Sequence, residues 1–165
     1  MTLIKTREIQ PPSGWRLALY RLPVYLYRIG LGGFFGRRFI MLHHTGRHSG
    51  QIRHTVLEVV QYDKNTGRYI IASGFGEHSQ WYKNLMCHPD AKLECLWKTV
   101  DVRAERLNAP EAEREMVSYG KRNPRAAQMV AGLIGYAHDG SEEDLREFSK
   151  VVPLIRLTPA RATNR

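Results

Sequence analysis

The residues best suited to chemistry lie in one short polar stretch at positions 45–53. It reads Thr-Gly-Arg-His-Ser-Gly-Gln-Ile-Arg and lies between two apolar runs. Arginine side chains, a serine hydroxyl and the N–H groups of a tight turn all donate hydrogen bonds, which suits a phosphate group. Arg47, Ser49 and Arg53 are such donors, and the two glycines allow backbone conformations that other residues disfavour. The stretch therefore predicts an anion-binding turn.

The two apolar runs beside this stretch have the composition of β-strands. Phe39–Leu42 precedes the stretch and Thr55–Val60 follows it. Strands joined by a short glycine-containing turn form a β-hairpin, so the polar stretch should be the tip of a hairpin. A second turn at Tyr62–Gly67 leads to a third strand, Arg68–Ser73. This succession of strands and turns predicts an antiparallel meander.

The rest of the chain adds three strands and most of the helices. Ser79 is placed to cap a short helix that follows the glycines after the third strand. Further strands are predicted at Ala91–Leu96, Thr99–Arg106 and Val151–Leu157. Later helices are predicted from Pro110 to Gly120, from Pro124 to about Ile134, and from Ser141 to about Lys150. Six strands with most helices late in the chain indicate an α+β domain with an antiparallel sheet or barrel.

Positive charge is concentrated in the first third of the chain. The net charge is +9, and residues 1–60 hold nine Lys or Arg residues against the two acids Glu8 and Glu58. Such a field attracts an anionic partner: a phosphorylated cofactor, nucleic acid or an anionic membrane. No helix-turn-helix, zinc-finger or aromatic RNA-binding signature accompanies the charge. A nucleic-acid partner is therefore not expected.

Length and composition bound the class of protein. A chain of 165 residues suits one domain with a sizeable core. It has no run of about 18 uncharged apolar residues and no signal peptide at its polar start, so a cytoplasmic location is expected. Cys87 and Cys95 give no disulfide framework.

The chain is expected to divide into four parts. Residues 1–14 have no periodicity and contain two prolines, which predicts a flexible tail, and residues 159–165 form a second tail. Residues 15–34 predict a helix and a glycine-rich connector ahead of the main domain, residues 35–158. The segment 15–31 mixes aromatic residues with arginines. It either packs on the domain or lies on an anionic membrane at the inner face of the cell.

Two motifs together resemble the deazaflavin (F420)-dependent nitroreductase family, also described as F420-dependent quinone reductases with an FMN-binding-like split barrel. The first is T-G-R-H-S-G-Q-I-R at 45–53, where the family usually shows T-G-R-K-S-G-x-x-R. The second is A-S-G-F-G at 72–76 followed by W-Y-K-N-L at 81–85, where the family shows a glycine-rich turn and then W-Y-x-N-L. The ending V-P-L-I-R-L at 152–157 looks like the family's final strand. The resemblance covers roughly residues 35–157.

The resemblance implies a fold and an activity. The fold would be an antiparallel split β-barrel of about six strands with peripheral helices. The activity would be hydride transfer from reduced coenzyme F420 to a small-molecule acceptor such as a quinone, a nitro compound or another electrophile. The cofactor would carry the redox chemistry while the protein binds and orients it. Split barrels often pair, so a homodimer is also implied.

The resemblance assigns roles to residues, position by position. The hairpin tip would hold the phosphate and anionic tail, the glycine-rich loop would line the ring edge, and the short helix would brace the site. The implied cofactor-binding set is Thr45, Gly46, Arg47, His48, Ser49, Gly50, Arg53, Thr55, Ser73, Gly74, Phe75, Trp81 and Asn84. The candidate catalytic residues are Ser73 and Tyr119, the latter as a proton donor or a wall of the acceptor site. Core packing is the alternative role for Tyr119 and Trp81.

One residue departs from the family pattern. His48 stands where the family commonly has lysine, and a histidine with an ordinary pKa is mostly neutral at pH 7, whereas lysine is a permanent cation. FMN is therefore an alternative cofactor. A split barrel that binds a cofactor or another ligand without turnover is the alternative function.

The histidines near the tip raise the question of a metal site. His43 and His44 are neighbours on a strand, so their side chains should point to opposite faces. No Cys-x-x-Cys or His-Glu-x-x-His spacing is present. No metal site is expected, and His44 is expected to be a barrel residue with local hydrogen bonds.

Overall fold

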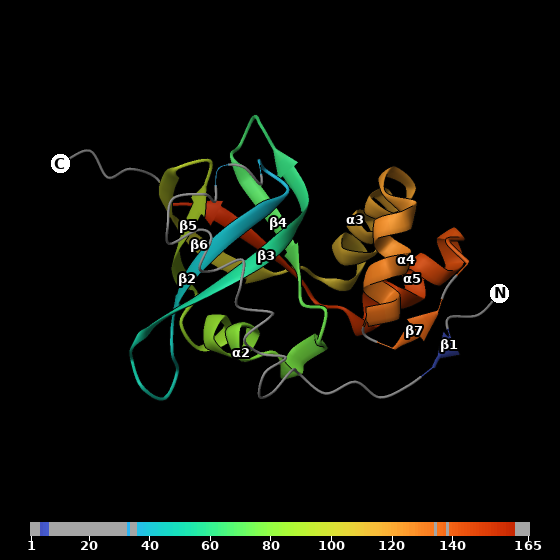
Figure 1. Ribbon diagram of the computed structural model, residues 1–165, viewed down its shortest axis with the longest axis horizontal. Helices are drawn as coiled ribbons and strands as arrows, with labels where there is room; N and C mark the ends of the chain where they lie inside the picture. Colours follow the sequence, from blue (N-terminus) through green and yellow to red (C-terminus); the bar gives the residue numbers. More distant parts are fainter. Residues whose placement is uncertain (1–3, 7–32, 34–35, 134, 138, 161–165) are drawn as a thin grey trace.

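Six strands form a closed barrel, and three of the helices gather on one side of it (Figure 1). The computed structural model describes residues 4–6, 33, 36–133, 135–137 and 139–160. The predicted helix and membrane-contact segment at 15–31 lies outside the described residues, as does most of the predicted tail at 1–14. The division of the chain into four parts stays a prediction.

The barrel strands follow the order β2-β3-β4-β8-β6-β5, and all neighbouring pairs are antiparallel. Their bounds are β2 Phe39–Thr45, β3 Ile52–Asp63, β4 Arg68–Ala72, β5 Asp90–Cys95, β6 Lys98–Arg106 and β8 Leu154–Pro159. Each one corresponds to a strand predicted from the sequence, which confirms the α+β antiparallel barrel. β8 begins only after Pro153, because proline lacks the N–H that a central strand needs.

Apolar side chains of β2 supply part of the barrel core. Ile40 and Leu42 are fully buried and pack with Leu93, Ile155 and Leu157 from other strands. Burial of each such side chain contributes about 1.5–3 kcal/mol. His43, which follows Leu42, lies on the other face and pairs in register with His54 of β3, while His44 is buried. The prediction that the two adjacent histidines face opposite ways is confirmed.

The helices beside the barrel form a second core. Met116 and Phe148 lie in it, at 2% and 1% exposure. Asn108 and Glu111 form a capping box at the start of the first helix, and the Ser141 side chain caps the last. The bounds are α3 Ala109–Arg122, α4 Pro124–Leu133 and α5 Glu142–Val151. A separate short helix, α2 Gln80–Cys87, follows the 3-10 turn η2 Gly76–His78 and lies across one end of the barrel.

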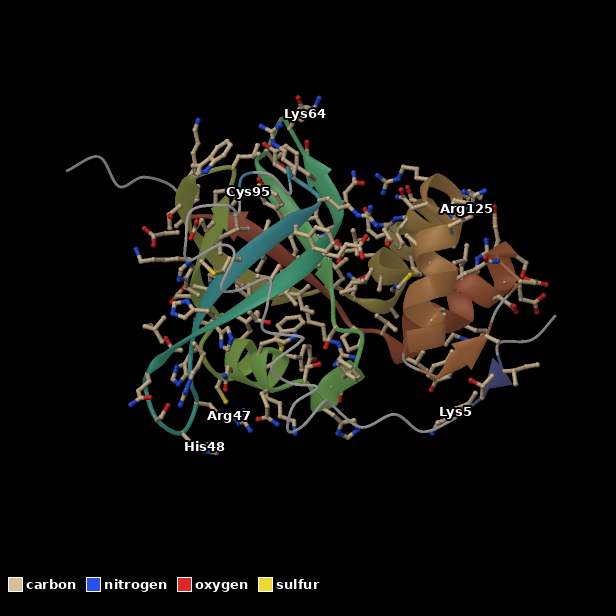
Figure 2. All side chains as sticks on the ribbon, viewed as in Figure 1. Lys5, Arg47, His48, Lys64, Cys95 and Arg125 are labelled. Carbon is tan, nitrogen blue, oxygen red and sulfur yellow. The ribbon has the colours of Figure 1, made fainter. Side chains whose placement is uncertain are left out.

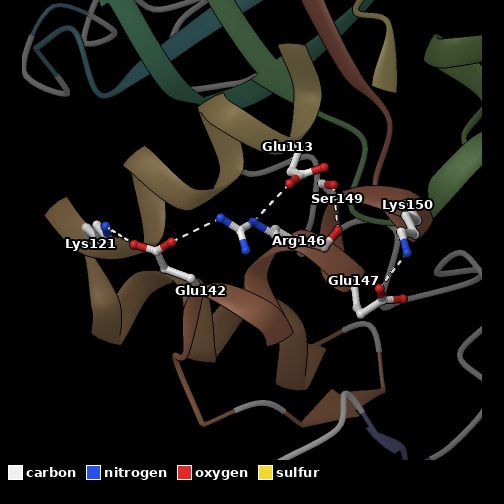
Figure 3. A network of polar contacts seen from close by, with 7 residues as sticks. All are labelled: Glu113, Lys121, Glu142, Arg146, Glu147, Ser149 and Lys150. Atoms are coloured by element: carbon white, nitrogen blue, oxygen red, sulfur yellow. Dashed lines mark hydrogen bonds and ion pairs between the residues drawn. The ribbon is translucent and has the colours of Figure 1, made fainter. Parts of the chain in front are cut away.

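Exposed ion pairs join α3 to α5 on the outer surface (Figure 3). Arg146 lies 2.9 Å from Glu113 and 3.1 Å from Glu142, and Glu142 also pairs with Lys121. Exposed pairs of this kind contribute about 0–1 kcal/mol each. The buried contacts between the helices, rather than these pairs, therefore supply most of their mutual stabilisation.

Two predictions about helix ends are wrong. Gly120 does not end α3, which continues to Arg122. A Cβ on Gly120 would lie 2.5 Å from Leu145, so the glycine allows α5 to approach closely. Ser79 does stand before α2, but its side chain makes no capping hydrogen bond. It contacts the Ser73 hydroxyl instead.

One small sheet is not predicted from the sequence. β1 Ile4–Lys5 pairs antiparallel with β7 Tyr136–Ala137, so part of the predicted flexible tail forms a strand. The pairing is too short to show an alternating apolar pattern. Within the described part of the chain, none of the helices has the length and apolar character needed to cross a bilayer.

Candidate functional site

The hairpin tip between β2 and β3 is closed by its own backbone. Gly46 N–H donates to the Gln51 carbonyl, and Gly50 N–H donates to the Gly46 carbonyl, both at 2.8 Å. Gly50 has a φ of +66°, which side chains disfavour. A Cβ on Gly46 would lie 2.8 Å from the Ser49 hydroxyl. The turn backbone therefore favours glycine at position 50, and the close approach of Ser49 favours it at position 46.

Arg47 is held against α2. Its backbone N–H and its Nη1 both donate to Asn84 Oδ1, at 3.1 and 3.0 Å. Its Nη2 donates to Gln80 Oε1 at 2.9 Å. Both acceptors are neutral amides, so the guanidinium keeps its full charge, and no acidic side chain of the described residues pairs with it. Arg47 is thus a fixed cation that remains available to an anion.

The other side of the Asn84 amide reaches into the barrel. Asn84 Nδ2 lies 3.1 Å from Nδ1 of His44, and the two residues are only 6% and 4% exposed. Burial lowers the pKa of His44 to about 4, with further lowering by the charges of His54, Arg53 and His43. His44 is therefore neutral at pH 7 and can accept a hydrogen bond through Nδ1.

Further donors surround Arg47 at the tip. Arg53 is exposed and lies opposite His44 in the β2–β3 register. It forms no ion pair with any acid in the described residues. His48 and Ser49 are exposed, and their backbone N–H groups have no hydrogen-bond partner within the described part of the chain. Figure 2 shows Arg47 and His48 together at the end of the hairpin.

The loop after β4 uses its serine internally. Ser73 is fully buried, and its hydroxyl donates to the Gly76 carbonyl at 2.6 Å and shares a hydrogen bond with Ser79 at 2.9 Å. Its backbone N–H donates to the Pro153 carbonyl. The catalytic role predicted for Ser73 has no support from this geometry, because the hydroxyl holds the loop in place. Gly74 and Phe75 of the same loop are partly exposed.

The remaining predicted residues support the two strands and α2. Trp81 is partly buried and packs against the barrel core, with its ring edge-on to Tyr82 at 6.3 Å. This arrangement favours the packing role for Trp81. Thr45 pairs with Ile52 and closes the β2–β3 ladder at the tip, and Thr55 pairs with Leu42 further along.

Tyr119 belongs to a different part of the molecule. It lines a cavity of about 520 Å³ between β3 and the helices α3 and α4. Its hydroxyl donates to Glu58 at 3.3 Å, and Arg38 donates to the same carboxylate at 3.4 Å. Burial and the Glu58 charge raise the pKa of Tyr119 to about 12. The cavity lining is Arg38, Glu58, Val59, Tyr119, Asn123, Pro124, Arg125 and Ala126.

The structure does not bring Tyr119 to the hairpin tip. Figure 2 places Arg47 at one end of the barrel and Arg125, which lines the cavity, beside the helices at the opposite corner. Glu58 and Arg38 are cavity residues that the sequence motifs did not identify. Glu58 lies on β3 and Arg38 precedes β2, so their pairing gives no local sequence signal.

His43 and His54 form a pair on the outer face of the barrel. His43 Nδ1 is 2.9 Å from His54 Nδ1, and His43 Nε2 is 3.4 Å from Glu94. No group of three or more His, Cys, Asp or Glu residues within the described chain is arranged to hold a metal ion.

Sequence comparison identifies a family for most of the chain. Residues 20–131 match the family model described as F420H(2)-dependent quinone reductase. No curated protein matches the chain.

Solved structures with the same fold bind different cofactors. An F420-H2 dependent reductase, FDR-A, is 20% identical, with a TM-score of 0.52 over 74% of this chain and 95% of that one. A pyridoxamine 5'-phosphate oxidase-related, FMN-binding protein from Nostoc punctiforme is 13% identical, with a TM-score of 0.53 over 90% and 81%. A domain-swapped dimer is 20% identical, with a TM-score of 0.51 over 74% and 81%. These similarities confirm the split-barrel fold.

The low pKa of His44 makes the stability of the fold depend on pH. The unfolded chain takes up a proton on this imidazole near pH 6.5, whereas the folded protein does so only near pH 4. Stability should therefore fall as the pH drops through this window, by up to about 3 kcal/mol from this group. Denaturant unfolding of the wild type and His44→Asn between pH 7 and 4 measures the effect. The variant should lose less stability, and parallel curves would contradict the prediction.

Proposed function

The chain belongs to the F420H(2)-dependent quinone reductase family, and from this premise we propose that it transfers hydride from reduced F420 to a quinone or a nitro compound. The hairpin tip is the proposed binding site for the anionic end of the cofactor. One observation carries this assignment: Arg47 is fixed by two neutral amides and has no acidic partner in the described residues.

The residues at the tip fit a phosphorylated cofactor. A fixed guanidinium loses little conformational entropy when it binds a phosphate, and it can form two parallel hydrogen bonds. Arg53 adds a second cation with no acidic partner among the described residues, and the N–H groups of His48 and Ser49 add neutral donors. Residues Gly74 and Phe75 are proposed to lie beside the ring, as the family motif implies. When bound, the deazaflavin supplies the hydride chemistry, while this chain binds and orients it.

The cavity at Tyr119 is the proposed acceptor site. Its volume of about 520 Å³ is in the range of small-molecule pockets. Because the pKa of Tyr119 is raised, the phenol stays protonated at neutral pH. Its O–H, which donates to Glu58 in this structure, would turn to a quinone or nitro oxygen when an acceptor binds. β3 contributes to both places: Ile52 closes the tip and Glu58 lines the cavity. These two residues are about 20 Å apart along the strand, a separation that the cofactor has to span.

FMN is the second candidate cofactor. The tip donors suit the phosphate of either molecule, and His48 replaces the lysine of the family motif. The fold is also that of an FMN-binding protein. We also propose three further properties: a homodimer, a cytoplasmic location and contact of residues 15–31 with a membrane. A barrel that holds a cofactor without turnover is the alternative function.

The direct test is titration of the purified protein with F420 and with FMN, followed by reoxidation of the reduced cofactor. We expect tight binding of F420, and faster oxidation of reduced F420 in the presence of protein with menadione or a nitroarene as acceptor. Tight binding without faster oxidation would favour the non-catalytic role. Binding of neither cofactor would refute both cofactor assignments.

Removal of Arg47 should weaken F420 binding selectively. Arg47→Ala is expected to raise the dissociation constant about 10- to 100-fold, the scale of a charge-assisted hydrogen bond. Arg37→Ala is the matched control, because Arg37 is exposed and lies over the Tyr62 ring, away from the tip. Isothermal titration calorimetry measures both. Equal effects of the two variants would mean that general surface charge, rather than the tip, attracts the cofactor.

A further inference from the structure

A continuous hydrogen-bonded chain links the barrel interior to the hairpin tip. It runs from His44 on β2 through Asn84 on α2 to Arg47 in the turn. Asn84 comes 40 positions after His44 and 37 after Arg47, so the fold rather than the local sequence assembles the chain. His44 and Asn84 are buried, whereas Arg47 is partly exposed. The buried part can therefore set the position of the exposed part.

The chemistry of Arg47 determines the orientation of the central amide. The backbone N–H and the guanidinium of Arg47 are both donors, so the group facing them must be the Asn84 carbonyl oxygen. The NH₂ group of Asn84 is then directed at His44. This donor needs an acceptor, so His44 Nδ1 must be unprotonated and the proton of the neutral imidazole must be on Nε2.

We infer that His44 is a positioning residue for the anionic cofactor, because its Nδ1 holds the Asn84 amide in the orientation that fixes Arg47. The inference rests on the proposed function, since it concerns the same cofactor site. His44 itself does not contact the cofactor in this role. Its effect is to remove the rotational freedom of Asn84, and with it that of the Arg47 guanidinium.

Burial of His44, and after it the charges around this side chain, lower its pKa and keep it neutral. Arg53 and His54 approach from β3, and His43 is its neighbour on β2. From β5, Lys92 and Glu94 lie near His43. On the tip side Arg47 lies across the Asn84 amide. A protonated His44 would place a donor against the Asn84 NH₂ group and would force the amide to turn away from Arg47.

A purely space-filling role for His44 is the competing explanation, and two substitutions separate it from the positioning role. His44→Leu replaces the imidazole with an apolar side chain of similar size and so removes the hydrogen-bond acceptor. His44→Asn is smaller, but its carbonyl oxygen is as many bonds from Cα as Nδ1 is. If His44 only fills space, the leucine variant should bind F420 more tightly than the asparagine variant. If it positions Asn84, the order should be reversed.

Titration with F420 at pH 7 tests this inference, with dissociation constants measured for the wild type, His44→Leu, His44→Asn, Arg47→Ala and the double variant His44→Leu/Arg47→Ala. We expect His44→Leu to weaken binding about fivefold, the scale of one hydrogen bond, and His44→Asn to restore most of the affinity. In the Arg47→Ala background, His44→Leu should have no further effect, because the position of Arg47 no longer matters.

The outcomes distinguish this inference from the proposed function. Unchanged affinity in Arg47→Ala would overturn the tip as the cofactor site and the inference with it. Weak binding by Arg47→Ala together with normal binding by His44→Leu would overturn the inference alone, as would additive effects in the double variant. ¹⁵N NMR of the His44 imidazole in the wild-type protein is a test that does not depend on the folding of any variant. A proton on Nε2 at pH 7 would support the inference, and a proton on Nδ1 would overturn it.

Discussion

The site depends on one oxygen atom, Oδ1 of Asn84, which accepts hydrogen bonds from both the backbone and the side chain of Arg47. This contact attaches a hairpin tip to a helix, and a tip of this length would otherwise lose its order easily. A buried acceptor of this kind is costly to leave unpaired, so each partner constrains the others. The orientation of α2 and the shape of the turn are therefore properties of one network.

The same network concentrates positive charge without cancelling it. Several other arginines pair with acids, as Arg146 does with Glu113 and Arg156 with Glu111. At the tip, Arg47 is bound by neutral amides and Arg53 has no acidic partner within the described residues. The stability of the fold does not require arginines that lack an acidic partner. It suits recognition of an anion, and it agrees with the excess of positive charge in residues 1–60.

Much of the fold could be predicted from the sequence because its signals are local. The apolar runs Phe39–Leu42 and Thr55–Val60, and the glycines at 46 and 50, were enough to place the hairpin and its tip. The pairing of His44 with Asn84 could not be predicted, because it joins positions far apart in the chain. For the same reason the sequence did not show that Ser73 is fully buried or that Tyr119 lies away from the tip. Gly120 misled the prediction because close helix packing and helix termination both favour glycine.

The central claim is that the hairpin tip binds the anionic end of F420. The most direct measurement is a titration of ¹⁵N-labelled protein with F420, followed by NMR of the backbone amides and the arginine side chains. We expect the N–H signals of His48 and Ser49 and the guanidinium signal of Arg47 to shift together and to saturate with the same dissociation constant. Shifts confined to residues around the Tyr119 cavity, with none at the tip, would contradict it.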